Sequence, residues 1–254
     1  MPERTVVSWG KNRIHMTEWD KIARLLEEFG DEWAADEVAE SSPEAQETPS
    51  VPAYTGTHPA VFFDRDGTLN EEVHYLHRIE DFKWIEGAPD AIKWLNEYGY
   101  RVVVVTNQAG IGHGYYTAAE VETLHHFMQA ELSKTGAHID AFYFSPWHPE
   151  AKVAAFRADH PDRKPGTGMF EQAIRALELD PRQCFVIGDR NSDIEAGRKL
   201  GMMTFLVLTG YGNQEKRETL AHFIVENAAE AVSHIEMLHT RKLKGFDTDL
   251  WDEA

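Results

Sequence analysis

Residues 61–70 read Val-Phe-Phe-Asp-Arg-Asp-Gly-Thr-Leu-Asn, and this stretch decides how the rest of the chain is interpreted. An apolar run of this kind is typical of a buried parallel strand. Residues two apart in an extended chain point the same way, so Asp64 and Asp66 can face one point at the strand's carboxyl end. Gly67 lets the backbone turn sharply directly afterwards.

Two carboxylates this close repel each other, which raises the pKa of one unless a cation or a proton relieves the repulsion. The pair suits phosphoryl transfer, in which one carboxylate attacks phosphorus and the other protonates the leaving oxygen and then activates water. A Mg²⁺ ion, which prefers oxygen ligands, would hold the phosphate against the nucleophile. The alternative is a turn with two solvated carboxylates, which a bare Asp-x-Asp-Gly motif leaves open.

The composition limits the classes of partner. The chain has 254 residues, 42% of them hydrophobic, and a formal net charge of −18. This acidity argues against nucleic-acid and anionic-membrane partners, which require a basic face, but not against a small anionic substrate. The single cysteine, Cys184, excludes an internal disulfide and lies in an apolar run, where we expect a small buried residue.

Targeting signals are not evident in the sequence. No apolar run approaches the roughly 18 residues that a membrane-spanning helix requires. The amino terminus, Met1-Pro2-Glu3-Arg4, has no apolar core like that of a signal peptide. We therefore expect a cytoplasmic protein.

The chain divides into four parts. Residues 1–30 form an extension with one amphipathic helix, in which Ile22, Leu25, Leu26 and Phe29 recur at helical spacing. That helix needs a surface to dock on, either the main domain or a partner that the sequence does not identify. Residues 31–56 are rich in Glu, Ala, Ser and Pro and are predicted to be a flexible acidic linker. The main domain spans 57–240, and 241–254 form a tail.

In the main domain, predicted strands alternate with predicted helices. Strands are expected at 61–63, 100–105, 139–144, 184–187, 204–208 and 223–225, and helices at 89–98, 117–134, 169–177, 193–200 and 228–238. This alternation predicts an α/β fold with a doubly wound parallel sheet. In such sheets ligands bind past the carboxyl ends of the strands.

Polar residues follow three of these strands at that edge. Thr106 and Asn107 offer a hydroxyl and an amide that suit a phosphate oxygen, although a helix cap or a loop hydrogen bond is the alternative. Asp189 follows a strand and a glycine, which is a good place for a metal-binding carboxylate. Asp193 could cap a helix or brace a lysine from behind the site.

Arg163 and Lys164 precede a helix that can bring them to the same edge. Lys164 would be a compact positive charge for the phosphate and the nucleophile. Arg163 offers a planar fork for a second anionic group. An Arg-Lys pair in a loop is often simply solvated, so the position of the pair, more than its identity, supports this interpretation.

Taken together, these segments resemble the haloacid-dehalogenase superfamily of phosphatases. The matching segments stand in order: Asp64-Arg65-Asp66-Gly67-Thr68-Leu69, Thr106-Asn107-Gln108, Arg163-Lys164-Pro165 and Gly188-Asp189-Arg190-Asn191-Ser192-Asp193. Within the superfamily, residues 59–240 most resemble the D-glycero-D-manno-heptose 1,7-bisphosphate 7-phosphatases. That similarity rests also on Tyr75-Leu76-His77-Arg78, Glu80-Asp81-Phe82, Ala109-Gly110-Ile111 and Gly114-Tyr115-Tyr116-Thr117.

The resemblance implies a role for each matching residue. Asp64 would be the nucleophile and Asp66 the general acid and base. Mg²⁺ would be bound by Asp64, the backbone carbonyl of Asp66 and Asp189. The phosphate or the rest of the substrate would be bound by Arg65, Thr106, Asn107, Arg163 and Lys164. Asp193 would support the site from behind.

The chain departs from the family at one loop. Relatives usually carry a zinc site of three cysteines and one histidine there, and the matching positions hold Ser145, Trp147, His160 and Asp162. Since no thiolate is present, we expect no tight structural zinc. Packing of Trp147 and Phe156, together with the prolines, would have to hold the loop instead.

The spacing of the motifs leaves no room for a cap domain. About 40 residues separate Asp66 from Thr106, and they are accounted for by one loop, one helix and one strand. Between Asn107 and Lys164 lie another helix, a strand and the loop. Loops would therefore select the substrate.

The sequence predicts a Mg²⁺-dependent phosphatase that acts on a small phosphorylated sugar, with the heptose bisphosphate as first candidate. Histidinol phosphate is the alternative, because the related phosphatases share Gly188-Asp189-Arg190. A polynucleotide 3′-phosphatase shares two motifs, but the acidity argues against it. An alternative of another class is a non-catalytic docking module that uses the helix in residues 1–30.

Overall fold

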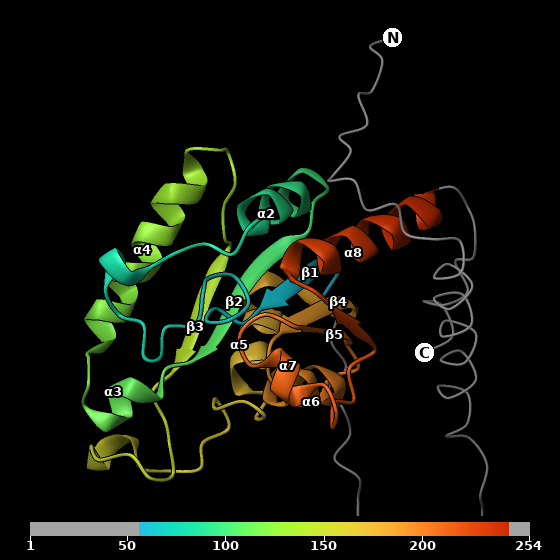
Figure 1. The fold of residues 1–254 in the computed structure, drawn as a ribbon. Coiled ribbons are helices and arrows are strands. Elements are labelled where there is room, and N and C mark those ends of the chain that lie inside the picture. Colours follow the sequence, from blue (N-terminus) through green and yellow to red (C-terminus); the bar gives the residue numbers. More distant parts are fainter. Residues whose placement is uncertain (1–55, 244–254) are drawn as a thin grey trace, which may run out of the picture. The chain divides into compact units, whose positions relative to one another are not determined.

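The computed structural model describes residues 56–243 (Figure 1). The predicted amphipathic helix, nearly all of the predicted linker and the end of the predicted tail lie outside the described residues. The division into extension, linker, domain and tail therefore stays a prediction. Within residues 56–243, none of the helices is both long and apolar enough to cross a lipid bilayer.

Six parallel strands form one sheet. They are β1 (His58–Phe63), β2 (Arg101–Asn107), β3 (Ala141–Ser145), β4 (Leu179–Gly188), β5 (Met203–Val207) and β6 (Phe223–Val225). Their order is β3-β2-β1-β4-β5-β6, and every neighbouring pair is parallel. The order reverses direction between β1 and β4, which is where a doubly wound sheet binds its ligand.

Helices cover both faces of the sheet. They are α2 (Ala88–Glu97), α3 (Ala109–His113), α4 (Ala118–Ser133), α5 (Gly168–Leu177), α6 (Asn191–Lys199), α7 (Gly212–Glu215) and α8 (Ala228–Leu243). Figure 1 shows α2, α4 and α8 on one side of the sheet and α5 and α6 on the other. This arrangement confirms the predicted doubly wound α/β fold. Among the described residues, no separate domain interrupts this order of strands and helices.

The core follows from the alternation of side chains along the central strands. Phe62 of β1 packs against Phe170 of α5, with ring centroids 5.0 Å apart. Phe63 points to the opposite face because successive residues of a strand alternate. Cys184 is fully buried, and its thiol donates a hydrogen bond to the Asp180 carbonyl at 3.0 Å. The predicted role of Cys184 as a small buried residue is confirmed.

Local sequence signals placed some element ends correctly. The Thr117 side chain accepts a hydrogen bond from the Glu120 N–H, and the Glu120 carboxylate accepts one from the Thr117 N–H, so α4 begins with a capping box at the residue where the predicted helix begins. Gly67 has φ +81° and makes the predicted sharp turn.

Other ends differ from the prediction. β4 begins at Leu179, five residues earlier than expected, because Leu179 pairs with His58 across an irregularity in the register. α8 continues past Leu238 to Leu243. Two short helices, α3 and α7, had no periodic apolar pattern long enough to predict them.

Candidate active site

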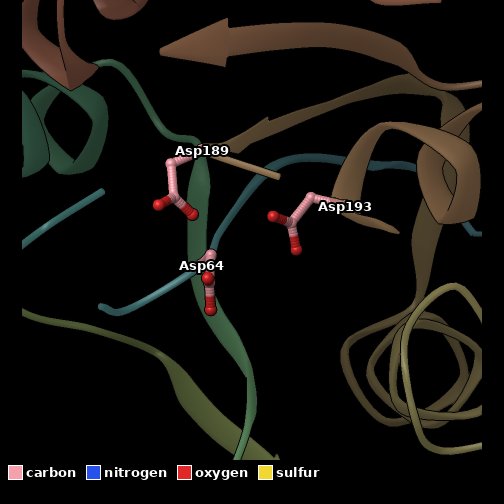
Figure 2. Close-up of side chains that lie close together, drawn as sticks. All are labelled: Asp64, Asp189 and Asp193. Carbon is pink, nitrogen blue, oxygen red and sulfur yellow. The ribbon is translucent and has the colours of Figure 1, made fainter. Parts of the chain in front are cut away.

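Three buried carboxyl groups meet where β1 and β4 end. Asp64 follows β1, Asp189 follows β4, and Asp193 lies in the first turn of α6 (Figure 2). One carboxylate oxygen of each lies within 4.8 Å of the others. Neighbouring parallel strands bring their carboxyl ends to the same edge, which is why residues more than a hundred positions apart converge here.

Lys164 lies among these carboxylates. Its ammonium group lies 2.9 Å from Asp64 Oδ1, forms an ion pair with Asp193, and donates to the Val105 carbonyl at 2.7 Å. The three donors of the ammonium group are thus all used. The side chain is 2% exposed, so these contacts are made away from water.

Burial and charge oppose each other at this cluster. Burial by itself would lower the pKa of Lys164, but the Asp193 and Asp64 charges raise it overall, so the lysine stays charged. Burial and the Asp64 and Asp193 charges raise the pKa of Asp189 to about 8. Burial also raises the pKa of Asp193 to about 6, although Lys164 opposes the rise. Three carboxyl groups and one lysine leave an excess of negative charge that a cation would neutralise.

The donor set fits Mg²⁺. Asp189 Oδ1 is buried and has no hydrogen-bond partner among the described residues. Oxygen atoms are the ligands that Mg²⁺ prefers, and carboxylates are their usual source. Asp64, Asp189 and Asp193 offer such oxygens close together, whereas no sulfur or imidazole nitrogen belongs to the group.

A loop after β5 supports Asp189 from the other side. The Tyr211 N–H donates to Asp189 Oδ2 at 2.8 Å, and the Thr209 hydroxyl donates to the Gly67 carbonyl at 2.6 Å. Gly210, with φ +54°, lets this loop approach, since a Cβ there would lie 2.1 Å from Asp189 Oδ2. Our sequence analysis missed this loop. Its signal is the Thr-Gly-Tyr-Gly run at residues 209–212, just past the carboxyl end of a predicted strand.

Hydrogen bonds from three side chains hold the Asp66 carboxylate in place. Its carboxylate accepts hydrogen bonds from Arg65 at 2.9 and 3.1 Å, from the Asn70 amide at 3.0 Å and from the Gln108 amide at 2.9 Å. Burial by itself would raise the pKa of Asp66, but the Arg65 charge and these hydrogen bonds lower it overall. Asp66 is therefore ionised here, and the repulsion expected between Asp64 and Asp66 is relieved by Arg65.

The side chain of Arg65 points into the protein. It is fully buried, and its guanidinium group binds Asp66, the Leu76 carbonyl and His125. The sequence predicted that Arg65 binds substrate or phosphate, and this stays a prediction; the structure places its side chain in these contacts within the protein. Residues next to each other in the extended chain point to opposite sides, so Arg65 turns into the protein while Asp64 faces the site.

The two polar residues at the end of β2 have different partners. Thr106 is buried, and its hydroxyl accepts a hydrogen bond from Gln108 Nε2 at 2.9 Å. The Asn107 amide binds the backbone of Lys164 twice, accepting from its N–H at 3.0 Å and donating to its carbonyl at 3.1 Å. Asn107 was predicted to bind phosphate, but here its side chain holds Lys164 in place.

Gln108 is a further residue whose role the sequence analysis missed. Its amide nitrogen joins Asp66 to Thr106, and its amide oxygen accepts a hydrogen bond from the Tyr116 hydroxyl at 2.7 Å. The same residue thereby links the first two sequence motifs. Its place in Thr106-Asn107-Gln108 was the available signal.

Arg163 lies at the side of the site. It is half-buried, and Nη1 donates to the Trp147 carbonyl at 3.1 Å. Burial, together with the charge of Arg190, lowers the pKa of Arg163. The Arg190 guanidinium carbon lies 3.6 Å from the ring centroid of Tyr211.

Of the positions that match the zinc loop, Ser145 is buried at the end of β3, while Trp147 and His160 stack on each other.

Comparison with known proteins identifies the family. The HAD-hydrolase-like family model matches residues 162–231. The D-glycero-beta-D-manno-heptose-1,7-bisphosphate 7-phosphatase of Haemophilus ducreyi is 38% identical over 178 residues, which cover 69% of this chain and 97% of that protein. The chain belongs to the haloacid-dehalogenase-like phosphatases. It is thus a hydrolase of phosphoric monoesters, as the sequence predicted.

Other relatives of this phosphatase carry related names. The D-glycero-alpha-D-manno-heptose-1,7-bisphosphate 7-phosphatase of Photorhabdus laumondii is also 38% identical, over 62% of this chain and 86% of that protein. The solved structure of D,D-heptose 1,7-bisphosphate phosphatase from Burkholderia thailandensis has a TM-score of 0.52 and 28% identity, covering 70% of this chain and 98% of that one.

One further structure shares the fold of this phosphatase. The D,D-heptose 1,7-bisphosphate phosphatase from B. bronchiseptica, complexed with magnesium and phosphate, has a TM-score of 0.64 and 24% identity. It covers 71% of this chain and 99% of that chain. At this level of identity the similarity supports the fold.

Proposed function

We propose that this phosphatase removes the 7-phosphate of D-glycero-D-manno-heptose 1,7-bisphosphate through an aspartyl-phosphate on Asp64, with Mg²⁺ as cofactor. The proposed chemistry rests on the contact of Asp64 with Lys164 beside the Asp189 carboxyl group. The proposed substrate rests on the relatives at 38% identity. One is named for the beta anomer and the other for the alpha anomer, so the anomer is a question for experiment.

Asp64 is placed for attack on phosphorus. Its Oδ1 accepts a hydrogen bond from the Arg65 N–H at 2.7 Å and contacts Lys164. Within residues 56–243, the hydrogen bond and the ion pair of the Asp64 carboxylate both use Oδ1, which leaves Oδ2 for the attack. The bond from phosphorus to Oδ2 forms as the bond from phosphorus to the sugar oxygen breaks.

Asp66 supplies and removes protons. The leaving sugar oxygen takes a proton from Asp66. Water then attacks phosphorus and gives its proton to Asp66, and the bond from phosphorus to Asp64 Oδ2 breaks, which releases phosphate and restores both carboxyl groups. The partners of Asp66 favour its charged form, which is the form that activates water. An incoming phosphate brings negative charge nearby, which raises the pKa of Asp66 and favours the protonated form for the first step.

The positive groups of the chain hold the substrate. Lys164 contacts both the nucleophile and Asp193, so its positive charge lies beside the point of attack. The Thr106 hydroxyl accepts from Gln108 Nε2, and its own hydrogen would be donated to the transferring phosphate. Mg²⁺, held by Asp64, Asp189 and the backbone carbonyl of Asp66, would neutralise charge on the phosphate oxygens. Preorganised charge of this kind supplies most of the rate in phosphoryl transfer.

Arg163 supports a second anionic group in the substrate. It is half-buried, its guanidinium group donates to the Trp147 carbonyl, and the charges of Arg190 and Asp159 both act on it. A planar guanidinium fork is suited to bind an anionic group. A sugar bisphosphate supplies that anion, whereas histidinol phosphate has a single phosphate and a cationic amine.

The test is phosphate release by the purified protein, with and without chelation of divalent metal. The substrates are both heptose 1,7-bisphosphate anomers, fructose 1,6-bisphosphate, histidinol phosphate and a 3′-phosphorylated oligonucleotide. We expect strong preference for a heptose bisphosphate, loss of activity with chelator and recovery with Mg²⁺. Equal rates on all substrates, or preference for histidinol phosphate, would contradict the proposed substrate.

The nucleophile is tested separately. Asp64→Asn should abolish phosphate release while the protein still folds, because the amide is a poor nucleophile. Asp90→Asn, at an exposed position in the first turn of α2, is the matched control and should retain activity. Phosphate release by the Asp64→Asn variant at the wild-type rate would refute the assignment.

A further inference from the structure

The segment between β3 and α5, residues 146–167, carries Arg163 and Lys164 but has little regular structure. Its only helical turn within the described chain is the 3-10 turn Ala154–Phe156. A long irregular loop loses much conformational entropy when it is fixed, so specific contacts have to hold it. Lys164 is fixed by Asp64, Asp193 and the Asn107 amide. Arg163, one residue earlier, has a different set of contacts.

Three rings from this segment pack on one another. The rings of Trp147 and His160 stack in parallel, with centroids 4.2 Å apart and an interplanar angle of 5°. Phe156 contacts the Trp147 ring edge-on, with centroids 5.6 Å apart. Aromatic contacts of these kinds stabilise a structure beyond the area they bury. They join the two ends of the segment across 13 residues.

Arg163 forms hydrogen bonds with the backbone carbonyls of both stacked residues. The Arg163 N–H donates to the His160 carbonyl at 2.9 Å, and Arg163 Nη1 donates to the Trp147 carbonyl at 3.1 Å. The backbone of Arg163 is therefore bonded to His160, and its guanidinium group is bonded to Trp147, the other member of the stacked pair. If the rings separate, the carbonyl of Trp147 moves away from the guanidinium group, and Arg163 loses the contact that aims it.

The hydration of Arg163 explains why such a tie is needed. Arg163 is half-buried, and its guanidinium group donates to the neutral carbonyl of Trp147. Without the tie, hydration would favour a guanidinium group that turns into water.

We propose that Trp147 and His160 form an aromatic clip that positions Arg163, so that its guanidinium group takes the substrate's second anionic group. The inference rests on the proposed function, because it assigns the specificity for a bisphosphate to this clip. Trp147 and His160 are positioning residues, since they act through Arg163 and do not touch the reacting phosphate. The clip consists of Trp147 and His160 only.

The experiment compares a bisphosphate with a phosphomonoester that lacks a second anion. KM and kcat are measured with heptose 1,7-bisphosphate and with p-nitrophenyl phosphate. We expect Trp147→Ala and His160→Ala to raise KM for the bisphosphate about tenfold, which is the loss of one hydrogen bond to a charged group. KM for the monoester and kcat for both should stay close to wild type. Trp147→Phe should largely restore the preference, because it keeps a planar ring.

Two further variants separate positioning from general stability. Trp94→Ala removes another stacked tryptophan, which lies on α2 and not on the segment that carries Arg163; its ring lies 4.3 Å from that of Tyr98. It should lower the melting temperature without changing the preference. In an Arg163→Ala background, Trp147→Ala should have no additional effect on KM, because its effect passes through Arg163.

Each outcome decides between the proposals. A wild-type protein with no preference for the bisphosphate would overturn the proposed substrate and this inference with it. A wild-type preference that Trp147→Ala leaves intact would overturn the clip alone. So would an equal rise in KM for both substrates, or an undiminished effect of Trp147→Ala in the Arg163→Ala background.

Discussion

Lys164 Nζ lies 2.9 Å from Asp64 Oδ1, and both side chains are buried. This contact joins a residue at the end of the first strand to one that precedes α5. It makes the positive charge of Lys164 part of the fold as well as part of the site, because the same ammonium group pairs with Asp193 and binds the carbonyl of Val105 on β2.

Lys164→Met should therefore impair both activity and stability. We expect kcat to fall about 100-fold or more, since a charge aimed at the transferring phosphate is lost. Removal of one partner from a buried ion pair should also lower the free energy of unfolding by about 3 kcal/mol. Urea unfolding and kcat measure the two effects. Lys199→Met is the control, because Lys199 is exposed on α6 and its ammonium group donates to the neutral Pro165 carbonyl. Wild-type kcat in Lys164→Met would contradict the assignment.

Gln108 should matter for turnover more than for binding. Gln108→Leu removes the amide that holds Asp66 against Thr106, and the leucine side chain cannot replace either hydrogen bond. We expect kcat to fall about tenfold with little change in KM, because the acid-base group is misplaced in the transition state. Tyr116→Phe removes only the hydrogen bond to the far side of Gln108 and should have a smaller effect. A larger effect in Tyr116→Phe than in Gln108→Leu would argue against this role.

The sequence predicted the parts of the site that depend on strand ends, because parallel strands deliver their carboxyl ends to one edge whatever the details. Asp64, Lys164, Asp189 and Asp193 all lie there. The capping box at Thr117 was predictable for a different reason, since its two partners are three residues apart.

What the sequence could not predict depends on contacts between distant segments. Whether Asn107 binds a phosphate or the backbone of Lys164 is decided by a loop 57 residues later. The inward turn of Arg65 depends on His125 in α4 and on the Leu76 carbonyl. The support of Asp189 by Tyr211 comes from a loop with no chemical motif of its own. The residue types at these positions indicated polar roles, but the sequence did not show which groups each side chain would contact.

His125 should make stability depend on pH. It is buried, its ring stacks on Phe142 with centroids 4.4 Å apart, and Nε2 lies 3.3 Å from Arg65 Nη1. Burial, together with the Arg65 charge, lowers the pKa of His125 to about 3. The unfolded chain takes up this proton near pH 6.5 and the folded protein does not, so the contribution is complete above that pH and is lost as the pH falls toward 3.

His125→Gln should remove this dependence while keeping an acceptor for Arg65. Between pH 7 and pH 5, the free energy of unfolding of the wild type should fall by about 2 kcal/mol more than that of the variant. Urea unfolding at the two pH values measures the difference. His126→Gln changes the neighbouring, exposed histidine and should behave like the wild type. Identical pH dependence in His125→Gln and the wild type would show that His125 is not the residue responsible.

Gly210 and Gly99 offer a matched test of how the loop after β5 supports Asp189. Both glycines have positive φ, +54° and +81°. A Cβ at Gly99 would meet nothing within 4 Å, so Gly99→Ala should cost only the backbone strain, about 1–2 kcal/mol. A Cβ at Gly210 would lie 2.1 Å from Asp189 Oδ2 and 2.7 Å from the Cα of Gly67. Gly210→Ala must therefore displace either the carboxyl group or the turn after Asp66.

We expect Gly210→Ala to raise the Mg²⁺ concentration needed for half-maximal phosphate release about tenfold or more, because Asp189 can no longer keep its position. Gly99→Ala should leave that concentration unchanged even though it lowers the melting temperature. Activity measured across a Mg²⁺ titration, beside thermal unfolding of both variants, separates the two effects. If the two substitutions shift the Mg²⁺ requirement equally, the loop supports the fold and not the metal site, and Asp189 would have to be positioned by β4 alone.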